Sequence, residues 1–290
     1  MSVYFVFIVI FDKLYNSNKI ILKKFKKYIK DCKKAVRYDR KKIYNKNPYI
    51  AICISVFNKE NHIEDNLLSI INQSFQDFEI IIVNDKSLDE NEKIIKKYQL
   101  EDDRIKLISH RNNYGVYRSR MESILNAKSK FTLLMEPDGM YLNENLLKEL
   151  YIYNQKNNIE IIEFSTYQQL ENGNKIYFPL NDYELHFHKF NQNIIFQPEL
   201  SEILYFNPKT KEHSGIICRN IYNKLILRNL LIQTYIYIGN EYFNDFIIYA
   251  DERIINIITY QFAKNYSNLY LWLFIYNKKN IFIERTCRKK

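Results

Sequence analysis

The sequence has few glycines, prolines and cysteines, and each shortage excludes a class of protein. Five Gly and five Pro in 290 residues exclude collagen-like and low-complexity architectures. The four cysteines show no Cys-x-x-Cys or other metal-ligand spacing, and a chain of this length can bury a core without disulfide bonds. Hydrophobic residues make up 47% and charged residues 26% of the chain, which excludes a disordered protein. We therefore expect a globular protein with reduced thiols.

The sequence also lacks a hydrophobic run long enough to cross a membrane. Residues 2–11 (SVYFVFIVIF) are apolar, but a spanning helix needs roughly 20 such residues. The run has neither the basic segment before it nor the small-residue cleavage site after it that mark a cleavable signal peptide. A buried strand and a membrane-touching stub both fit this run. We expect a protein of the cytoplasm or of the cytoplasmic face of a membrane.

Excess negative charge is absent as well, and the positive charge is confined to one segment. The chain has a net charge of +10, whereas residues 1–47 alone contain fourteen Lys or Arg and three Asp, which leaves −1 for residues 48–290. A protein that tracks phosphates usually carries its charge on the folded surface, so nucleic acid is not an expected partner. Apolar residues at 22, 25, 29, 32 and 36 form one stripe of a basic helix. That helix could pack on the main domain or make peripheral contact with an anionic membrane.

Beyond residue 47, strand and helix patterns alternate. Short β-branched runs predict strands at 49–57, 79–83, 104–109 and 131–135. Helical patterns follow them at 61–73, after 87, at 116–127 and from about 143, and the first two begin with apparent capping boxes, Asn61 with Glu64 and Ser87 with Glu90. Strands joined by helices of this length form a parallel sheet with right-handed crossovers. We therefore predict an α/β fold.

Polar and acidic residues follow three of these strands, at the edge where such sheets bind ligands. They are Asn58 and Glu60 after the first strand, where Phe57 precedes them, Asn84 and Asp85 after the second, and Glu136 and Asp138 after the fourth. A carboxylate at one strand end is often only a helix cap, but acidic or amide groups at three ends favour a ligand site.

These residues, in this order, resemble glycosyltransferase family 2, whose members have the GT-A nucleotide-sugar fold. Residues 50–91 (IAICISVFNKENHIEDNLLSIINQSFQDFEIIIVNDKSLDEN) are similar to the opening of that family, and residues 104–140 (RIKLISHRNNYGVYRSRMESILNAKSKFTLLMEPDGM) to its next block, with N-x-G, an Arg and a D-x-D-like strand end. The resemblance implies a Rossmann-like, mostly parallel mixed sheet flanked by helices over residues 48–290. Residues 48–166 would form the nucleotide-sugar half and 167–290 the acceptor half, after a basic N-terminal helical extension at 1–47.

The resemblance also implies roles for particular residues. Asp85 would lie beside the nucleotide base, and Glu136 and Asp138 would hold Mn2+ or Mg2+, cations that oxygen ligands suit. Arg120 could touch a phosphate or hold an acidic side chain in place. The donor would be a UDP- or GDP-linked sugar, and the acceptor an unknown glycan, lipid or protein. The other residues expected at the nucleotide-sugar site are Phe57, Asn58, Glu60, Asn84 and Glu136.

A separate carboxylate must deprotonate the acceptor hydroxyl for an inverting transfer. The family places it in an E-D pair at the start of a late helix, and the matching pair here is Asp251 and Glu252. If the pair aligns directly, Glu252 is the base and Asp251 supports it. Acids at a helix N-terminus are also favoured by the helix dipole alone, so a purely structural role remains an alternative.

Several positions depart from the family pattern. Asn84 and Glu136 each replace an acid that the family has as Asp, Lys86 and Gly139 replace further motif residues, and the late pair is reversed. Because a misplacement of about 1 Å can cost roughly a hundredfold in rate, a catalytically impaired relative that binds a sugar nucleotide or glycan is an alternative. Another is a membrane-docking interaction protein that acts through residues 1–47.

Overall fold

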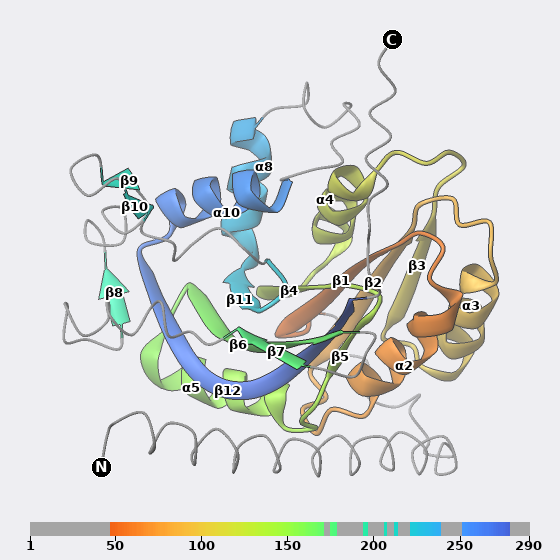
Figure 1. Ribbon diagram of the computed structural model, residues 1–290, viewed down its shortest axis with the longest axis horizontal. Helices are drawn as coiled ribbons and strands as arrows, with labels where there is room; N and C mark the ends of the chain where they lie inside the picture. Colours follow the sequence, from red (N-terminus) through yellow and green to blue (C-terminus); the bar gives the residue numbers. More distant parts are fainter. Residues whose placement is uncertain are drawn as a thin grey trace.

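In the computed structural model, the described residues are 47–170, 175–178, 194–196, 206–207, 212–213, 221–238 and 251–278 (Figure 1). The apolar run and the basic helix expected before residue 47 lie outside them, and both stay predictions. None of the helices in the described part of the chain has the length and hydropathy that a bilayer crossing requires. Cys53, the cysteine that is described, is a free buried thiol, and burial raises its pKa to about 12.

The centre of the described structure is one mixed sheet with the strand order β3-β2-β1-β4-β11-β6-β12-β5. Its first four strands are those expected: β1 (Ile50–Val56), β2 (Phe78–Asn84), β3 (Ile105–Ser109) and β4 (Phe131–Met135). They pair in parallel, with Val56 opposite Asn84 and Asn84 opposite Ser109, so their carboxyl ends share one edge. The predicted α/β class is confirmed.

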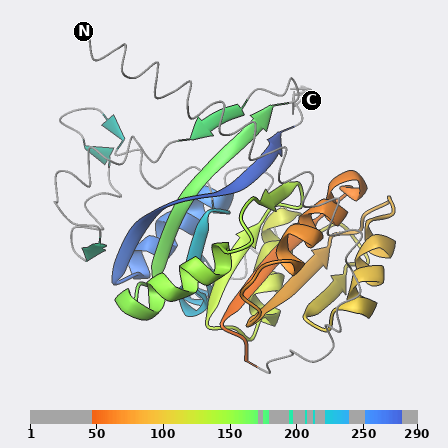
Figure 2. The ribbon, with the colours of Figure 1, turned by 90° about the horizontal axis from the view of Figure 1, so that it is seen from below.

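The second half of the sheet mixes directions. Strand β11 (Lys224–Leu227) pairs antiparallel with both β4 and β6 (Ile161–Leu170), and so joins the two halves. Figure 2 shows β6 and β12 (Asn265–Lys278) running side by side, and these two strands pair in parallel. The remaining strands are β5 (Gly139–Tyr141) and β8 (Ile194–Phe196), which pair with β12, β7 (Lys175–Phe178), which pairs with β6, and the separate ladder of β9 (Phe206–Asn207) and β10 (Glu212–His213).

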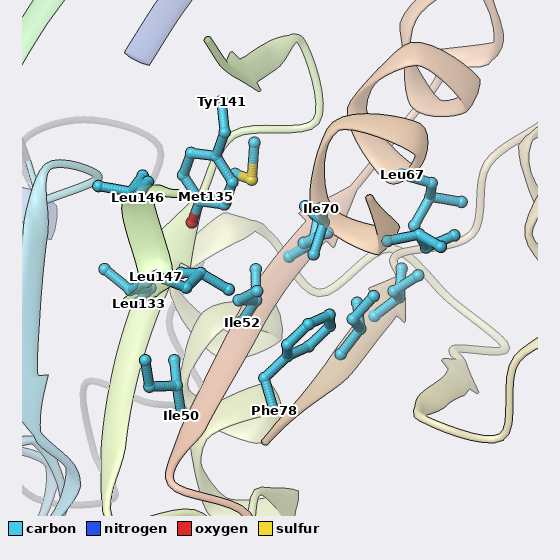
Figure 3. Packing of buried hydrophobic residues seen from close by; sticks show 14 of the residues in the cluster. Ile50, Ile52, Leu67, Ile70, Phe78, Leu133, Met135, Tyr141, Leu146 and Leu147 are labelled. Atoms are coloured by element: carbon cyan, nitrogen blue, oxygen red, sulfur yellow. The ribbon is translucent and has the colours of Figure 1, made fainter. Parts of the chain in front are cut away.

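Helices cover both faces of the sheet because the strands alternate apolar residues toward each side. In β1, Ile50, Ile52 and Ile54 face one cluster, whereas Ala51 and Cys53 face the other. The first cluster packs against α2 (Glu60–Ile71), α3 (Asn91–Glu101) and α5 (Leu146–Asn157); side chains of α2 and α5 meet those of β1 and β4 in Figure 3. The second packs against α4 (Val116–Asn126), α8 (Arg228–Ile238) and α10 (Asp251–Phe262).

Both predicted capping boxes are wrong. The N-cap residues are Lys59 for α2 and Glu90 for α3, and neither makes a side-chain capping bond. Instead, the backbone N–H of Glu60 donates to Asp89 Oδ2 (2.9 Å), and the backbone N–H of Glu90 donates to Glu60 Oε2 (2.9 Å). The loops after β1 and β2 lie beside each other because their strands are neighbours, so each helix start is satisfied by the other loop.

Candidate active site

A pocket of about 250 Å³ opens at the carboxyl ends of β1 and β4. Strands β2 and β3 lie on one side of β1 and β4 lies on the other, so this is the point where the strand order reverses. Open α/β sheets bind ligands at such a switch point. The pocket is lined by Ser55, Val56, Phe57, Lys59, Asp85, Asn113, Gly115, Val116, Ser119, Glu136 and Pro137.

Asp85 lines the pocket, and hydrogen bonds from the backbone hold its carboxylate in place. Oδ1 accepts the backbone N–H of Tyr114 (2.8 Å), and Oδ2 accepts that of Gly115 (2.8 Å). Gly115 has φ 90° and ψ 162°, a conformation open essentially to glycine alone. The N-x-G turn therefore does a specific job: it aims two successive N–H groups at one buried carboxylate.

His110 supports Asp85 from the other side, and the sequence analysis did not identify it. Its Nδ1 lies 2.7 Å from Asp85 Oδ1, and its Nε2 lies 2.8 Å from Glu122 Oε2. The signal that could have found it is its position, because His110 directly follows β3 as Asp85 directly follows β2. Its backbone N–H donates to Asn84 O (2.9 Å), which continues the ladder between these strands.

Asp138 contacts the pocket residue Lys59, and its carboxylate is held far less completely than that of Asp85. Its Oδ2 accepts a hydrogen bond from Lys59 Nζ (2.8 Å), while its Oδ1 is buried with no hydrogen-bond partner among the described residues. Burial raises the pKa of Asp138, the nearby Glu136 charge adds to this, and Lys59 opposes both. An unsatisfied buried oxygen is costly.

The carboxylate oxygens of Asp138 have the donor chemistry that suits a divalent cation. Carboxylate oxygens such as Asp138 Oδ1 are hard ligands of the kind that Mg2+ and Mn2+ take. The described residues contain no group of three or more His, Cys, Asp or Glu that would hold a metal by themselves. Mg2+ commonly binds one or two carboxylates together with substrate phosphates, and Glu136 and Asp138 match that arrangement.

Glu136 also belongs to a cluster that reaches the late helix. Arg120 Nη2 lies 2.6 Å from Glu136 Oε1 and 3.5 Å from Glu252 Oε1. Tyr222 joins them: its hydroxyl accepts a hydrogen bond from Arg120 and donates one to Glu252 Oε1. Burial raises the pKa of the Tyr222 hydroxyl well above its ordinary value, against the Arg120 charge, so this donor stays protonated. Of the two roles open to Arg120, the structure shows the holding of acidic side chains.

Glu252 therefore lies beside Arg120 and Tyr222, and its role as a base stays a prediction. The Asp251 side chain is outside what the structure describes. Glu252 is the second residue of α10, and 23% of its side chain is exposed. Tyr222 was missed by the sequence analysis, and no local signal distinguishes it in a chain with 25 Tyr. It reaches Glu252 only because β11 brings residues 221–227 to the sheet beside β4.

The other expected donor-binding residues divide into two groups. Phe57 is 44% exposed and lines the pocket. Asn58 and Asn84 instead join the loops, because Asn58 Oδ1 accepts the backbone N–H of Leu88 (2.8 Å) and Asn84 Nδ2 donates to Glu92 (3.0 Å). Glu60 likewise bonds to the loop after β2, through Asp89 and Glu90, so donor contacts of these three residues stay predictions.

The sequence model of glycosyl transferase family 2 matches residues 51–230, more than half of the chain. This protein belongs to glycosyl transferase family 2. The predicted resemblance is thus confirmed for residues 51–230, and the division into a nucleotide-sugar half and an acceptor half stays a prediction.

Similar proteins agree with this family. A glycosyltransferase of Methanocaldococcus jannaschii is 28% identical over 184 residues, which are 63% of this chain and 61% of that protein. Glycosyltransferase GlyG of Streptococcus pneumoniae is 23% identical over 129 residues, 44% of this chain and 42% of that protein. The matches cover 41–61% of the first curated relatives, so this chain spans only part of their length.

Solved structures of Staphylococcus aureus TarS share the fold. TarS 1–349 in complex with UDP-GlcNAc has a TM-score of 0.58 and 17% identity, and the match covers 80% of this chain and 59% of that one. The complex of TarS 1–349 with UDP gives a TM-score of 0.59 at 18% identity, covering 80% and 61%. At such low identity, the likeness shows the architecture alone.

Proposed function

We propose that this family member is a metal-dependent, inverting glycosyltransferase that moves a sugar from a nucleoside-diphosphate donor to an acceptor hydroxyl. The observation that carries the proposal is the pocket at the switch point. It is lined by Asp85, whose carboxylate accepts two backbone N–H groups, and by Lys59, which binds Asp138, a carboxylate with one buried oxygen that has no described partner. The acceptor would be a glycan, lipid or protein.

The surroundings of Asp85 suit the base of the donor. Asp85 lines the pocket, and Tyr114, Gly115 and His110 fix the orientation of its carboxylate. Uracil and guanine each present a ring N–H that a carboxylate can accept. The solved complexes of TarS with UDP-GlcNAc and UDP support a UDP-linked donor, and a GDP-linked donor has the same chemistry.

The wall of the pocket formed by α4 suits the diphosphate. Gly115, Val116 and Ser119 line the pocket, so the N-terminal turn of α4 lies at its wall. Helix N-termini favour anions through their backbone N–H groups and through the helix dipole. Glu136 and Asp138 would hold Mn2+ or Mg2+ beside it, and the ion would supply charge neutralisation for the departing diphosphate.

Glu252 is the proposed general base, with Asp251 as its neighbour at the start of α10. The Tyr222 hydroxyl and Arg120 orient the Glu252 carboxylate, which stays partly exposed toward an acceptor. It would take the proton of the acceptor hydroxyl as that oxygen attacks the sugar from the face opposite the diphosphate, which inverts the anomeric configuration.

The departures from the family pattern support activity more than its loss. Asn84, which replaces an acid, holds the loop after β2 by accepting the backbone N–H of Ser87 (3.1 Å) and donating to Glu92, and it does not line the pocket. Glu136 keeps a carboxylate and lies in contact with Arg120. The alternative of a family member that binds its ligand without turnover is an outcome of the test below.

The test measures donor hydrolysis for a panel of UDP- and GDP-sugars with Mn2+, in the wild type and in Asp138→Ala. Because metal charge stabilisation contributes several kcal/mol, we expect the variant to lose about a hundredfold or more in rate. The exposed Asp103→Ala removes a carboxylate away from the pocket and serves as the control. Equal turnover in the wild type and Asp138→Ala would contradict the proposal.

Thermal unfolding with the same panel separates enzyme from binding protein. A nucleotide at roughly 100 times its dissociation constant adds about 2.7 kcal/mol of stability. Stabilisation without turnover would identify a binding protein of the same family.

A further inference from the structure

Lys59 is the basic residue that lines the pocket, and neither the motifs of the chain nor its family assign it a role. It is the N-cap residue of α2, and its ammonium lies 2.8 Å from Asp138 Oδ2. Its side chain is 32% exposed, so the ammonium is open to the pocket as well as to the carboxylate. Arg120, a basic residue at the same edge, already contacts Glu136, Tyr222 and Glu252.

The backbone of Lys59 is anchored while its side chain keeps its reach. On one side the N–H of Asn58 donates to Ser87 Oγ (3.1 Å), and on the other the N–H of Glu60 donates to Asp89 Oδ2 (2.9 Å). A lysine side chain is a compact charge on a flexible four-carbon stem with three rotatable donors. From this fixed origin, the ammonium can contact Asp138 or an anion in the same pocket.

Two cations cannot share Asp138 without a cost. A metal ligated by an Asp138 oxygen would lie at about 2.0–2.2 Å from it, close to an ammonium that sits at 2.8 Å from the same carboxylate. Their repulsion lowers the affinity for a bare metal ion. A diphosphate changes the balance, because its negative charge attracts both cations and supplies oxygens to each.

We propose that Lys59 is a second cation for the donor diphosphate and that it disfavours metal binding until the diphosphate is present. This inference rests on the proposed function and deepens it. Lys59 thereby makes the metal and the nucleotide bind together: it covers Asp138 when the pocket holds no anion and contacts the diphosphate when the metal takes the carboxylate.

The test uses Lys59→Met in the full chain and looks for effects of opposite sign. Mn2+ alone, followed by electron paramagnetic resonance of the free ion, should bind several-fold more tightly to the variant than to the wild type. UDP or GDP with saturating Mn2+, followed by calorimetry, should bind roughly tenfold more weakly, as expected for one lost charge-assisted hydrogen bond. Uridine or guanosine should bind equally to both.

The matched control is Lys93→Met, which removes the same charge and a surface ion pair with Glu90 (2.7 Å) away from the pocket. All of its affinities should stay within about twofold of the wild type. Lys59→Gln repeats the charge loss with a polar side chain and serves if the Met variant is unstable. Lys59→Arg keeps the charge and should retain most of the diphosphate affinity.

Each outcome decides the proposal. Parallel losses of Mn2+ and diphosphate affinity would assign Lys59 a merely structural role, and Mn2+ binding no tighter than in the wild type would remove the competition; either result overturns the inference. A wild type that binds neither UDP nor GDP in Mn2+ would instead refute the proposed function, and the Mn2+ comparison would still test the competition by itself.

Discussion

Two aspartates at the pocket differ in how the protein holds them: Asp85 lines the pocket, and Asp138 contacts the lining residue Lys59. Asp85 and Asp138 both follow parallel strands at one sheet edge, and both are buried, at 4% and 6% exposure. The Asp85 carboxylate receives two backbone N–H groups and His110, whereas the Asp138 carboxylate receives Lys59 on one oxygen and nothing described on the other.

The difference comes from the loops and not from the strands. The turn before α4 passes over Asp85 and presents its N–H groups, while the chain after β4 continues directly into β5 and presents none to Asp138 Oδ1. The three contacts of the Asp85 carboxylate set its orientation and leave one of its roughly four acceptor sites for a ring N–H. An unbonded carboxylate oxygen such as Asp138 Oδ1 has the donor chemistry that a divalent cation takes.

The largest stability effect is expected for Asp85→Asn. The amide keeps the shape but offers one oxygen where two are used, so its NH2 must face a backbone N–H or His110 inside the protein. We expect a loss of about 3 kcal/mol in the free energy of unfolding, measured in urea. Asp103→Asn, on the surface, is the control. A loss below about 0.5 kcal/mol for Asp85→Asn would show that hydrogen bonds do not distinguish the Asp85 carboxylate from that of Asp138.

A smaller loss of stability is expected for Gly115→Ala, which disturbs the backbone turn that holds Asp85. The φ of 90° is a conformation that costs any residue with a Cβ about 1–3 kcal/mol. We expect a loss of about 2 kcal/mol in unfolding free energy together with weaker nucleotide binding. Asn126→Ala, at the other end of α4, should change stability by less than about 0.5 kcal/mol. If Gly115→Ala keeps both stability and nucleotide affinity, the turn does not hold Asp85.

The smallest effect, of opposite sign, is expected for Asp138→Asn in metal-free protein. Burial and the Glu136 charge raise the folded-state pKa of Asp138, so its ionised form costs stability at neutral pH. Loss of the Lys59 pair, whose lysine is partly exposed, offsets this by about 0.2–1 kcal/mol. The variant should therefore be as stable as the wild type at pH 7, or more stable by about 1 kcal/mol or less.

The pH dependence of the unfolding free energy tests the sign of this effect. Below the ordinary Asp pKa of about 3.9, wild-type Asp138 is protonated in both the folded and the unfolded state and costs nothing. As the pH rises through the raised folded-state pKa, the wild type loses stability relative to Asp138→Asn. Urea unfolding from pH 3 to pH 7 should show that the stability difference between the variant and the wild type grows. A variant clearly less stable than the wild type at pH 7 would mean that the Asp138 carboxylate, like that of Asp85, is stabilised by its surroundings.

Much of the fold and part of the site could be predicted from local patterns. Short β-branched apolar runs located β1 to β4, and the rule that ligands bind at the carboxyl ends of strands selected Asp85 and Glu136, which line the pocket. The capping boxes failed because the true partners of the helix starts lie in a neighbouring loop. Lys59, His110 and Tyr222 were missed for the same reason, since their partners are 79, 25 and 30 residues away along the chain.

The amino-acid order by itself determined that this chain forms alternating strands and helices of glycosyl transferase family 2, because burial of apolar faces requires only local periodicity. Tertiary structure alone decided which carboxylate has hydrogen-bond partners on both oxygens and which keeps one oxygen without a described partner. Hydrogen bonds act over about 3 Å, and only the folded sheet brings the turn before α4 to Asp85, Lys59 to Asp138, and Tyr222 to Glu252.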